Sequence, residues 1–188
     1  MPKPETPYAK DELMLFLEQS YQDVRVFFAE LDDATFFRPQ GEAWSPAQHL
    51  DHLCRAVAPL AQAMVLPKLV LRFRFGKGPG TSRTYDEIRE VYLAGLERGV
   101  KARGRFLPTA DVDDPTRAAD VHKERLRDWQ RAGHALISAT TRWREEHLDG
   151  YFLPHPAIGK LTIREMLFFT LYHNRHHLER VRSRLTDG

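Results

Sequence analysis

The chain has little that would tie it to an oxidising compartment or a membrane. It contains one cysteine, Cys54, so no internal disulfide can form and a reducing compartment is expected. Met1 to Lys10 contains no apolar segment of the kind found in signal peptides. The most apolar stretch, Ala56 to Leu71, is interrupted by polar residues and prolines and is too short to span a bilayer. These absences predict a cytoplasmic protein with no membrane partner.

An excess of charge of either sign is also missing. The 28 basic residues nearly balance the 26 acidic ones, and the formal net charge is +2. This balance predicts no nucleic-acid partner, because phosphate binding needs an excess of Lys and Arg. The basic stretch from Arg72 to Lys77 is interrupted by two phenylalanines and a glycine, and we interpret it as a solvated loop. The length and the 42% hydrophobic content predict one globular domain over residues 1–188.

Strand patterns are almost absent, whereas apolar residues recur at spacings of three and four. This periodicity predicts a first helix over about 9–32, followed by a loop to about residue 41. A second helix begins after the cap Ser45, and Gln48 completes a capping box. The second helix extends to about residue 71, with a kink or an early break at its prolines.

The second half of the sequence predicts two more long helices. A shorter helix over about 84–97 begins with a capping box, and 99–114 is interpreted as an irregular crossover. A long helix is expected over about 115–147. A structured loop over 151–160 precedes the last helix, 162–185, which begins with a capping box of Thr162 and Glu165. The pattern predicts an all-α fold, a four-helix bundle with one additional short helix and a long crossover.

The nine histidines are the residues best suited to carry chemistry. His173 and His177 lie four residues apart on the predicted inward stripe of the last helix, so their rings can converge on one cation. Such pairs also arise by chance, so the spacing alone is a hypothesis. A catalytic metal site usually has three protein ligands. Either His49 or His52 of the second helix is placed to be the third, and periodicity does not decide between them. His176 is expected at the margin of the interior.

Three short motifs carry a resemblance to a known family. They are AWSPAQHLDHL at 43–53, HPAIGKLT at 155–162 and YHNRHHL at 172–178, in that order along the chain. They resemble the W-S-x-x-x-x-x-x-H-L, H-P-x-x-G-x-L-T and Y-H-x-x-x-H motifs of the DinB-like superfamily. The resemblance implies a helical bundle of mixed up-and-down topology. It also implies a metal held by His52, His173 and His177, which selects His52 over His49.

The resemblance sets the expected chemistry as well. The superfamily holds nickel, zinc or a related divalent ion and includes mycothiol-dependent isomerases, bacillithiol S-transferases and metal-dependent hydrolases. We therefore expect a metal-dependent enzyme. The leading hypothesis is S-transfer from a low-molecular-weight thiol to small electrophiles, since metal coordination lowers the pKa of a thiol. The alternatives are hydrolysis by metal-bound hydroxide and a non-catalytic metal-binding bundle. The three histidines do not separate these hypotheses.

No general base can be identified from the sequence. His49 and His176 are candidates for proton transfer, although each is also typical of a polar pocket margin. Asp51 and Glu179 neighbour the proposed ligands, but adjacent helical residues point about 100° apart. Cys54 is expected to be a small buried hydrophobe. A small-molecule substrate is expected, and the family suggests a homodimer, although the sequence leaves the substrate and the oligomeric state open.

Overall fold

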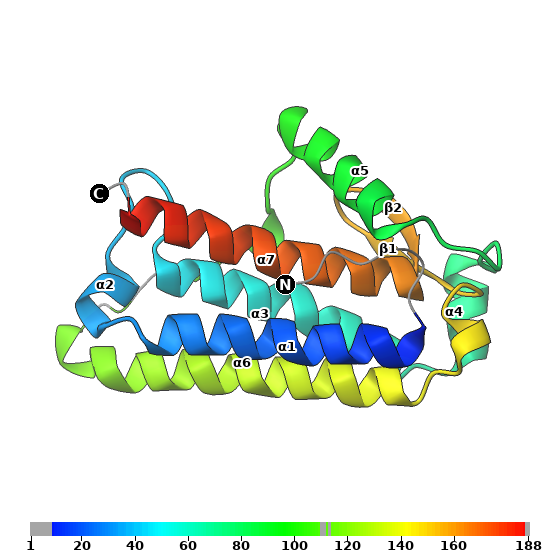
Figure 1. The fold of residues 1–188 in the computed structure, drawn as a ribbon, viewed down its shortest axis with the longest axis horizontal. Coiled ribbons are helices and arrows are strands. Elements are labelled where there is room, and N and C mark those ends of the chain that lie inside the picture. Colours follow the sequence, from blue (N-terminus) through cyan, green and yellow to red (C-terminus); the bar gives the residue numbers. More distant parts are fainter. Residues whose placement is uncertain (1–8, 110–111, 113, 187–188) are drawn as a thin grey trace.

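The structure is a computed structural model that describes residues 9–109, 112 and 114–186. The predictions for the first eight residues, and for residues 110, 111 and 113 of the crossover, lie outside this range. Four long helices pack side by side (Figure 1), so the predicted four-helix bundle is confirmed. They are α1 (Lys10–Ala29), α3 (Pro46–Met64), α6 (Ala118–Thr141) and α7 (Ile163–Thr186).

The order of packing explains the long connection between α3 and α6. Both α1 and α3 pack against α6 and α7, so α1 and α3 lie diagonally across the bundle. In Figure 1, α1 and α7 run in one direction, and α3 and α6 run in the other. Because α3 and α6 are parallel neighbours, the chain must return along the bundle between them. This return includes α4 (Lys68–Phe75), α5 (Tyr85–Glu97) and a 3-10 turn at Gly104–Phe106.

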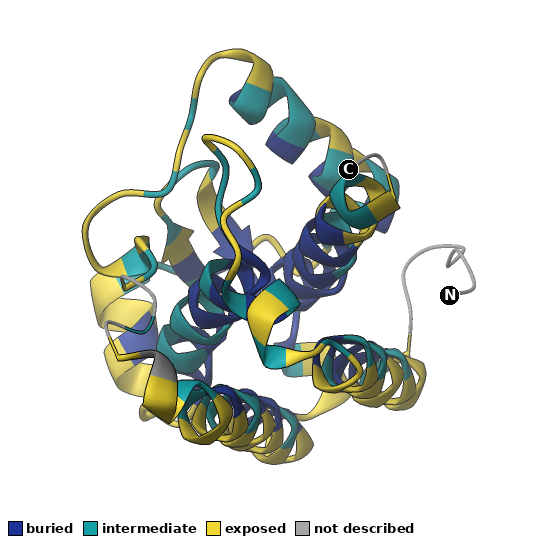
Figure 2. Cartoon of the chain, turned by 90° about the vertical axis from the view of Figure 1, so that its left-hand side faces the viewer, coloured by how far each residue is buried: buried dark blue, intermediate teal, exposed yellow. Residues whose placement is uncertain are grey.

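The core forms where the apolar stripes of the long helices meet. On α1 the buried residues recur every three or four positions: Leu13, Leu17, Tyr21, Val24 and Phe28. Figure 2 shows that the buried residues of the long helices face inward and the exposed ones outward. Burial of such stripes is the main favourable term in bundle folding. The indole of Trp129 crosses this core and donates a hydrogen bond of 3.0 Å to the carbonyl of Tyr21.

Three helices begin with the capping boxes that the sequence predicted. The Ser45 hydroxyl accepts from the Gln48 N–H at 3.2 Å, and the Gln48 side chain accepts from the Ser45 N–H at 3.0 Å. The same reciprocal pairs start α5 and α7. Each box satisfies N–H groups that have no partner within the helix. The cap at Ser45 fixes the start of α3, and hence the positions of His49 and His52 on its first two turns.

The predicted second helix is in fact two helices. It passes through Pro59 and ends at Met64, and α4 begins after Pro67 with a bend of 112°. Pro67 cannot continue α3, because proline lacks the N–H that the helix needs. The interpretation of Arg72 to Lys77 as a loop was wrong, since α4 extends to Phe75. In the part of the chain that the structure describes, no single helix could cross a membrane, and only the bent pair of α3 and α4 has the length and composition.

Two further predictions for helices are corrected. The loop predicted for 32–41 contains the five-residue helix α2 (Asp33–Phe37), which is too short to show periodicity. The helix predicted to reach about residue 147 ends at Thr141. Trp143 is buried in the turn that follows, where its indole donates at 2.9 Å to the carbonyl of Met64 at the end of α3.

The segment predicted as a loop over 151–160 forms a β-hairpin instead. Strand β1 (Phe152–His155) pairs antiparallel with β2 (Gly159–Thr162), and the buried Leu153 and Leu161 lie opposite each other. The ring of His155 closes the turn, because its Nδ1 accepts from two backbone N–H groups at 3.2 and 3.3 Å. Strands of four residues are too short to show alternation, which explains why the sequence analysis missed them. The hairpin leads directly into α7.

Candidate metal centre

Three imidazoles converge between α3 and α7. The Nε2 atom of His173 lies 3.2 Å from Nε2 of His52 and 3.1 Å from Nε2 of His177. The candidate ligand atoms of all three residues lie within 4.8 Å of one another. The side chains are 7%, 4% and 6% exposed for His52, His173 and His177. The structure therefore brings together the three residues that the motifs selected, and metal binding by them stays a prediction.

The chain fixes the tautomer of His52. Its Nδ1 lies 2.7 Å from the backbone carbonyl of Phe106 in the crossover. A carbonyl oxygen only accepts hydrogen bonds, so Nδ1 carries the proton and donates it. Nε2 therefore presents a lone pair to His173. A backbone carbonyl that orients a ligand imidazole in this way is a common feature of protein metal sites.

His49, the alternative third ligand in the sequence analysis, contacts His177 instead. The Nδ1 atoms of the two rings lie 2.7 Å apart. When His177 uses Nε2 as a ligand, its Nδ1–H donates to Nδ1 of His49. Nε2 of His49 is then a buried donor with no hydrogen-bond partner among the described residues. His49 is thus placed to orient a ligand rather than to be one.

The proton count at the centre favours a cation. Only Nε2 of His52 is fixed as an acceptor, by the Phe106 carbonyl. If Nε2 of His173 carries no proton, it faces the lone pair of His52, and if it carries one, that proton can serve only one of its two neighbours. Every tautomer of the neutral rings therefore leaves at least one of the two short contacts without a hydrogen bond, which is unfavourable in a buried site. A tetrahedral ion with metal–nitrogen bonds of about 2.0–2.1 Å separates its ligand nitrogens by about 3.3 Å. The distances of 3.1 and 3.2 Å are close to that value, so the donor set fits a divalent ion.

Burial keeps these imidazoles neutral. It lowers the pKa values of His173 and His177 well below 6.5, and the neighbouring histidines lower them further. Burial also lowers the pKa of His52, although the Phe106 hydrogen bond acts against this. For His49, burial and then the charges of Arg180 and Arg184 lower the pKa to about 3. Neutral imidazole is the form that binds metal, so the cluster is ready for a cation at neutral pH.

Aromatic rings surround the cluster. Trp44 stacks on His177 with ring centroids 6.2 Å apart, and it also lies 5.0 Å from the ring of His52. Phe169 stacks on His173 at 5.0 Å, and the edge of Tyr92 from α5 meets His173 at 6.0 Å. The sequence analysis did not assign these aromatic residues to the site. Their rings hold the imidazoles in place and lower the local dielectric constant, which strengthens electrostatic interactions at the centre.

A buried carboxylate holds the crossover against α3. Asp51 accepts from the backbone N–H of Thr109 at 2.8 Å, from Arg55 at 2.7 Å and from Arg125 at 2.8 Å. Burial acts to raise the pKa of Asp51, but these hydrogen bonds and charges lower it overall. Thr109 lies three residues after Phe106, so the network fixes the carbonyl that orients His52. Sequence reasoning missed this support, because a backbone carbonyl contact leaves no signal in residue types.

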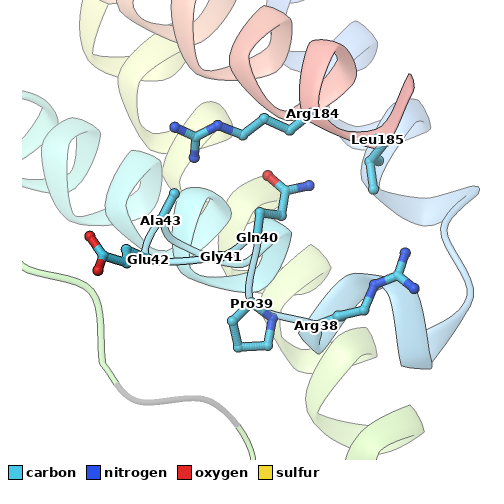
Figure 3. A pocket seen from close by; sticks show the side chains of 8 residues that line it. All are labelled: Arg38, Pro39, Gln40, Gly41, Glu42, Ala43, Arg184 and Leu185. Carbon is cyan, nitrogen blue, oxygen red and sulfur yellow. The ribbon is translucent and has the colours of Figure 1, made fainter. Parts of the chain in front are cut away.

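The remaining candidates lie around the cluster. His176 is partly exposed, its ring lies 5.9 Å from that of Tyr92, and burial lowers its pKa to about 4. Burial raises the pKa of the Cys54 thiol to about 12, which argues against a nucleophilic role. An open cleft of about 670 Å³ lies near the end of α7 (Figure 3) and contains none of the predicted site residues. Its lining is Arg38, Pro39, Gln40, Gly41, Glu42, Ala43, Arg184 and Leu185.

Comparisons with known proteins agree with the motifs and the fold. The family model described as DinB superfamily matches residues 17–181. The solved structure TT2238, described as a four-helix bundle protein, is 18% identical, with a TM-score of 0.56 and coverage of 93% of this chain and 98% of that one. YfiT from Bacillus subtilis, described as a probable metal-dependent hydrolase with an unusual four-helix bundle topology, is 14% identical, with a TM-score of 0.53 and coverage of 97% and 91%. No curated protein matches.

One sequence-based expectation is corrected by these comparisons. The near-balanced charge predicted no nucleic-acid partner, yet a similar structure is that of the colibactin self-resistance protein ClbS in complex with double-stranded DNA. It is 11% identical, with a TM-score of 0.48 and coverage of 95% of this chain and 96% of that one. Net charge averages over the whole surface and does not describe local patches. We therefore withdraw the exclusion of nucleic acid, and a likeness of this degree assigns no DNA binding to this chain.

Proposed function

This chain belongs to the DinB superfamily, and we propose that it is a divalent-metal-dependent enzyme whose ion is held by His52, His173 and His177. The observation that carries the proposal is the meeting of three buried Nε2 atoms in an arrangement where no tautomer of the neutral rings makes both short contacts hydrogen bonds. Three protein ligands leave coordination positions open, as catalytic sites require. Nickel and zinc both suit imidazole ligands.

The residues of this chain have separable roles in the proposed site. When bound, the ion supplies Lewis acidity, which lowers the pKa of a coordinated thiol or water. The Phe106 carbonyl and His49 hold His52 and His177 with Nε2 directed to the centre. Trp44 and Phe169 pack on the ligand rings and exclude water from that side.

We favour S-transfer from a low-molecular-weight thiol to a small electrophile as the reaction. A thiol has a pKa near 8.5, whereas that of water is 15.7, so a thiol needs a much smaller shift to react at neutral pH. In the described part of the chain, no carboxylate is hydrogen-bonded to the three imidazoles and available as a general base. The pKa values of His49 and His176, about 3 and about 4, make both weak bases. These features favour a nucleophile that coordination alone can activate.

Hydrolysis is the second candidate function. The description of YfiT as a probable metal-dependent hydrolase favours it, since that protein shares the fold at a TM-score of 0.53. The same three imidazoles serve both reactions, so the choice depends on which nucleophile the site accepts.

The test is a calorimetric titration of the metal-loaded protein with bacillithiol, mycothiol and glutathione, which measures the binding of each thiol. Each mixture is then assayed for conjugation of 1-chloro-2,4-dinitrobenzene and for hydrolysis of 4-nitrophenyl acetate. We expect saturable binding of one thiol and metal-dependent conjugation. The His173→Ala variant should lose both, and His134→Ala, on the exposed face of α6, should keep both. Metal-dependent ester hydrolysis that none of the three thiols affects would favour a hydrolase function over S-transfer. Metal binding without either activity would favour a non-catalytic bundle.

A further inference from the structure

Exposed apolar side chains gather at one end of the molecule. Five of the eight large hydrophobic residues found exposed in the described chain fall within residues 65–73. Leu69 and Phe73, one turn apart on α4, are 78% and 90% exposed, whereas Leu71 on the opposite face is fully buried. Apolar side chains on the face opposite the core are normally covered when they lie together in a patch. We call the five residues the α4 patch: Val65, Leu66, Leu69, Val70 and Phe73.

The charges around the α4 patch have one sign. Residues 65–82 contain no aspartate or glutamate. Three exposed cations in this segment, Arg72, Arg74 and Lys77, have no carboxylate partner among the described residues. The side chain of Lys68 is turned away from them, since its Nζ lies 2.5 Å from Nδ1 of His147. The near-balanced charge of the whole chain averages over this local excess.

The acids beside this segment are already neutralised. Glu145 and Glu146 lie in the 3-10 turn that contains His147, the partner of Lys68. Glu145 pairs with Arg164 at 2.5 Å, and Glu146 pairs with Arg144 at 2.6 Å. Glu145 and Glu146 therefore do little to cancel the positive charge around the α4 patch.

We propose that the α4 patch is a docking surface for an anionic lipid bilayer. Leu69, Val70 and Phe73 project from the two-turn helix α4, and Val65 and Leu66 lie in the turn before it. These exposed side chains can enter the headgroup region while the flanking arginines meet lipid phosphates. This combination of apolar residues and cations is typical of interfacial membrane-binding helices. The inference is independent of the reaction at the metal centre.

Other partners fit the α4 patch less well. A second copy of the chain related by two-fold symmetry would bring the same cations of both copies together, which is unfavourable. Nucleic acid would neutralise the arginines but would leave Leu69 and Phe73 without an apolar partner. A bilayer satisfies both kinds of side chain at once.

Helix α4 lies well away from the metal centre. In Figure 1, α4 lies at the right-hand end of the bundle, beyond the last turn of α3. His52 lies twelve residues before Met64 on α3, which is about 18 Å along the helix axis. A bilayer in contact with the α4 patch would therefore hold the protein by one end and leave the histidine cluster outside the bilayer.

The test is sedimentation of the full chain with phosphatidylcholine vesicles, with and without 30% phosphatidylglycerol. We expect binding to the anionic vesicles that weakens in 0.5 M salt. Leu69→Gln/Phe73→Gln should weaken partitioning about tenfold or more, and Arg72→Gln/Arg74→Gln by a similar factor. Both changes are at exposed positions, and circular dichroism should confirm that the variants fold.

Matched controls separate the α4 patch from general surface effects. Leu15→Gln removes a comparably exposed leucine from α1, and Arg127→Gln/Arg142→Gln removes two exposed arginines elsewhere. Both controls should partition like the wild type. The proposal is overturned if the chain does not bind anionic vesicles, or if the control variants weaken vesicle binding as much as the α4 patch variants do. It is also overturned if gel filtration finds a dimer that Leu69→Gln/Phe73→Gln separates, or if the chain binds duplex DNA through Arg72 and Arg74 but not vesicles.

Discussion

Two buried polar clusters lie along α7, and they differ in how well their groups are satisfied. At the start of the helix, Arg164 donates to Asp149 at 2.7 and 3.1 Å and to Glu145 at 2.5 Å. The next residue, Glu165, accepts from Arg83 at 3.0 Å. About two and a half turns later, His173 meets the imidazoles of His52 and His177 at 3.2 and 3.1 Å. The first cluster pairs every charge that it buries, whereas in the second no tautomer of the neutral rings makes both short contacts hydrogen bonds.

This difference separates a structural role from a functional one. A buried network whose donors and acceptors all match contributes to a unique fold and needs no ligand. A buried cluster that leaves acceptors facing one another is costly unless something binds there. The comparison predicts that changes in the first cluster act on stability and changes in the second act on metal binding.

The largest effect is expected from His173→Ala. Structural zinc sites bind with roughly 10–16 kcal/mol, and this energy is shared among few ligands, so loss of one of three should weaken binding about a thousandfold or more. Competition with a chromogenic chelator measures the affinity, and thermal unfolding of the metal-free protein shows that the variant folds. Retention of wild-type affinity would show that His173 is not a ligand.

Arg164→Met should lower the stability of the protein and leave its metal affinity unchanged. It removes the guanidinium from Asp149 and Glu145, which keep only Ser82 and the Lys10 N–H as donors among the described residues. Because the two carboxylates are 18% and 52% exposed, the cost should be below that of a fully buried pair, at about 2 kcal/mol of unfolding free energy. Urea denaturation measures this loss, and Arg164→Lys should recover part of it. The folded Arg164→Met protein should still take up its ion. If metal affinity falls along with stability, the two clusters are not separable.

His49→Phe tests the support of a ligand. It removes the acceptor of the His177 Nδ1–H, and loss of such a partner typically weakens metal binding 10- to 100-fold. His49→Gln offers an amide oxygen in place of the ring nitrogen and should lose less. Competition with the chromogenic chelator again measures the metal affinity of each variant. Equal losses in both variants would mean that His49 acts through packing rather than through its hydrogen bond.

The smallest effect, taken for each pH unit, is the pH dependence of the metal-free protein. Burial lowers the pKa values of His49 and His155 to about 3 and about 4, whereas the unfolded chain takes up these protons near pH 6.5. Stability should therefore fall as pH drops from 6.5 towards 4, by about 1.4 kcal/mol per pH unit for each such imidazole. Urea denaturation between pH 7 and 4.5 measures this slope, and a bound ion should reduce it. A flat profile would contradict neutral buried imidazoles.

Much of the fold follows from local sequence signals. The four long helices carry apolar stripes and capping residues, which depend on neighbours a few positions away. The hairpin at 152–162 and the short helices α2 and α4 were missed or misassigned, because elements this short give too few residues for a period. The end of α6 was misplaced, because Trp143 bonds to Met64, a residue 79 positions away.

The candidate site shows the same contrast between residues that local sequence signals predict and residues that depend on long-range contacts. The pair His173 and His177 follows from helical spacing, and the choice of His52 rests on the motif. The role of His49 as the partner of His177 depends on a contact 128 residues away, and periodicity alone gave it equal weight with His52. The Phe106 carbonyl has no side-chain signature at all. Such support can be found only once the crossover is placed.

Elemental analysis of the purified protein, combined with X-ray absorption at the edge of the ion that is found, tests the central claim most directly. We predict one divalent ion per chain, with a first shell that contains three imidazole nitrogens at about 2.0–2.1 Å. Protein expressed in metal-supplemented medium that retains no ion would contradict the account. An ion whose shell contains no histidine nitrogen would contradict it as well.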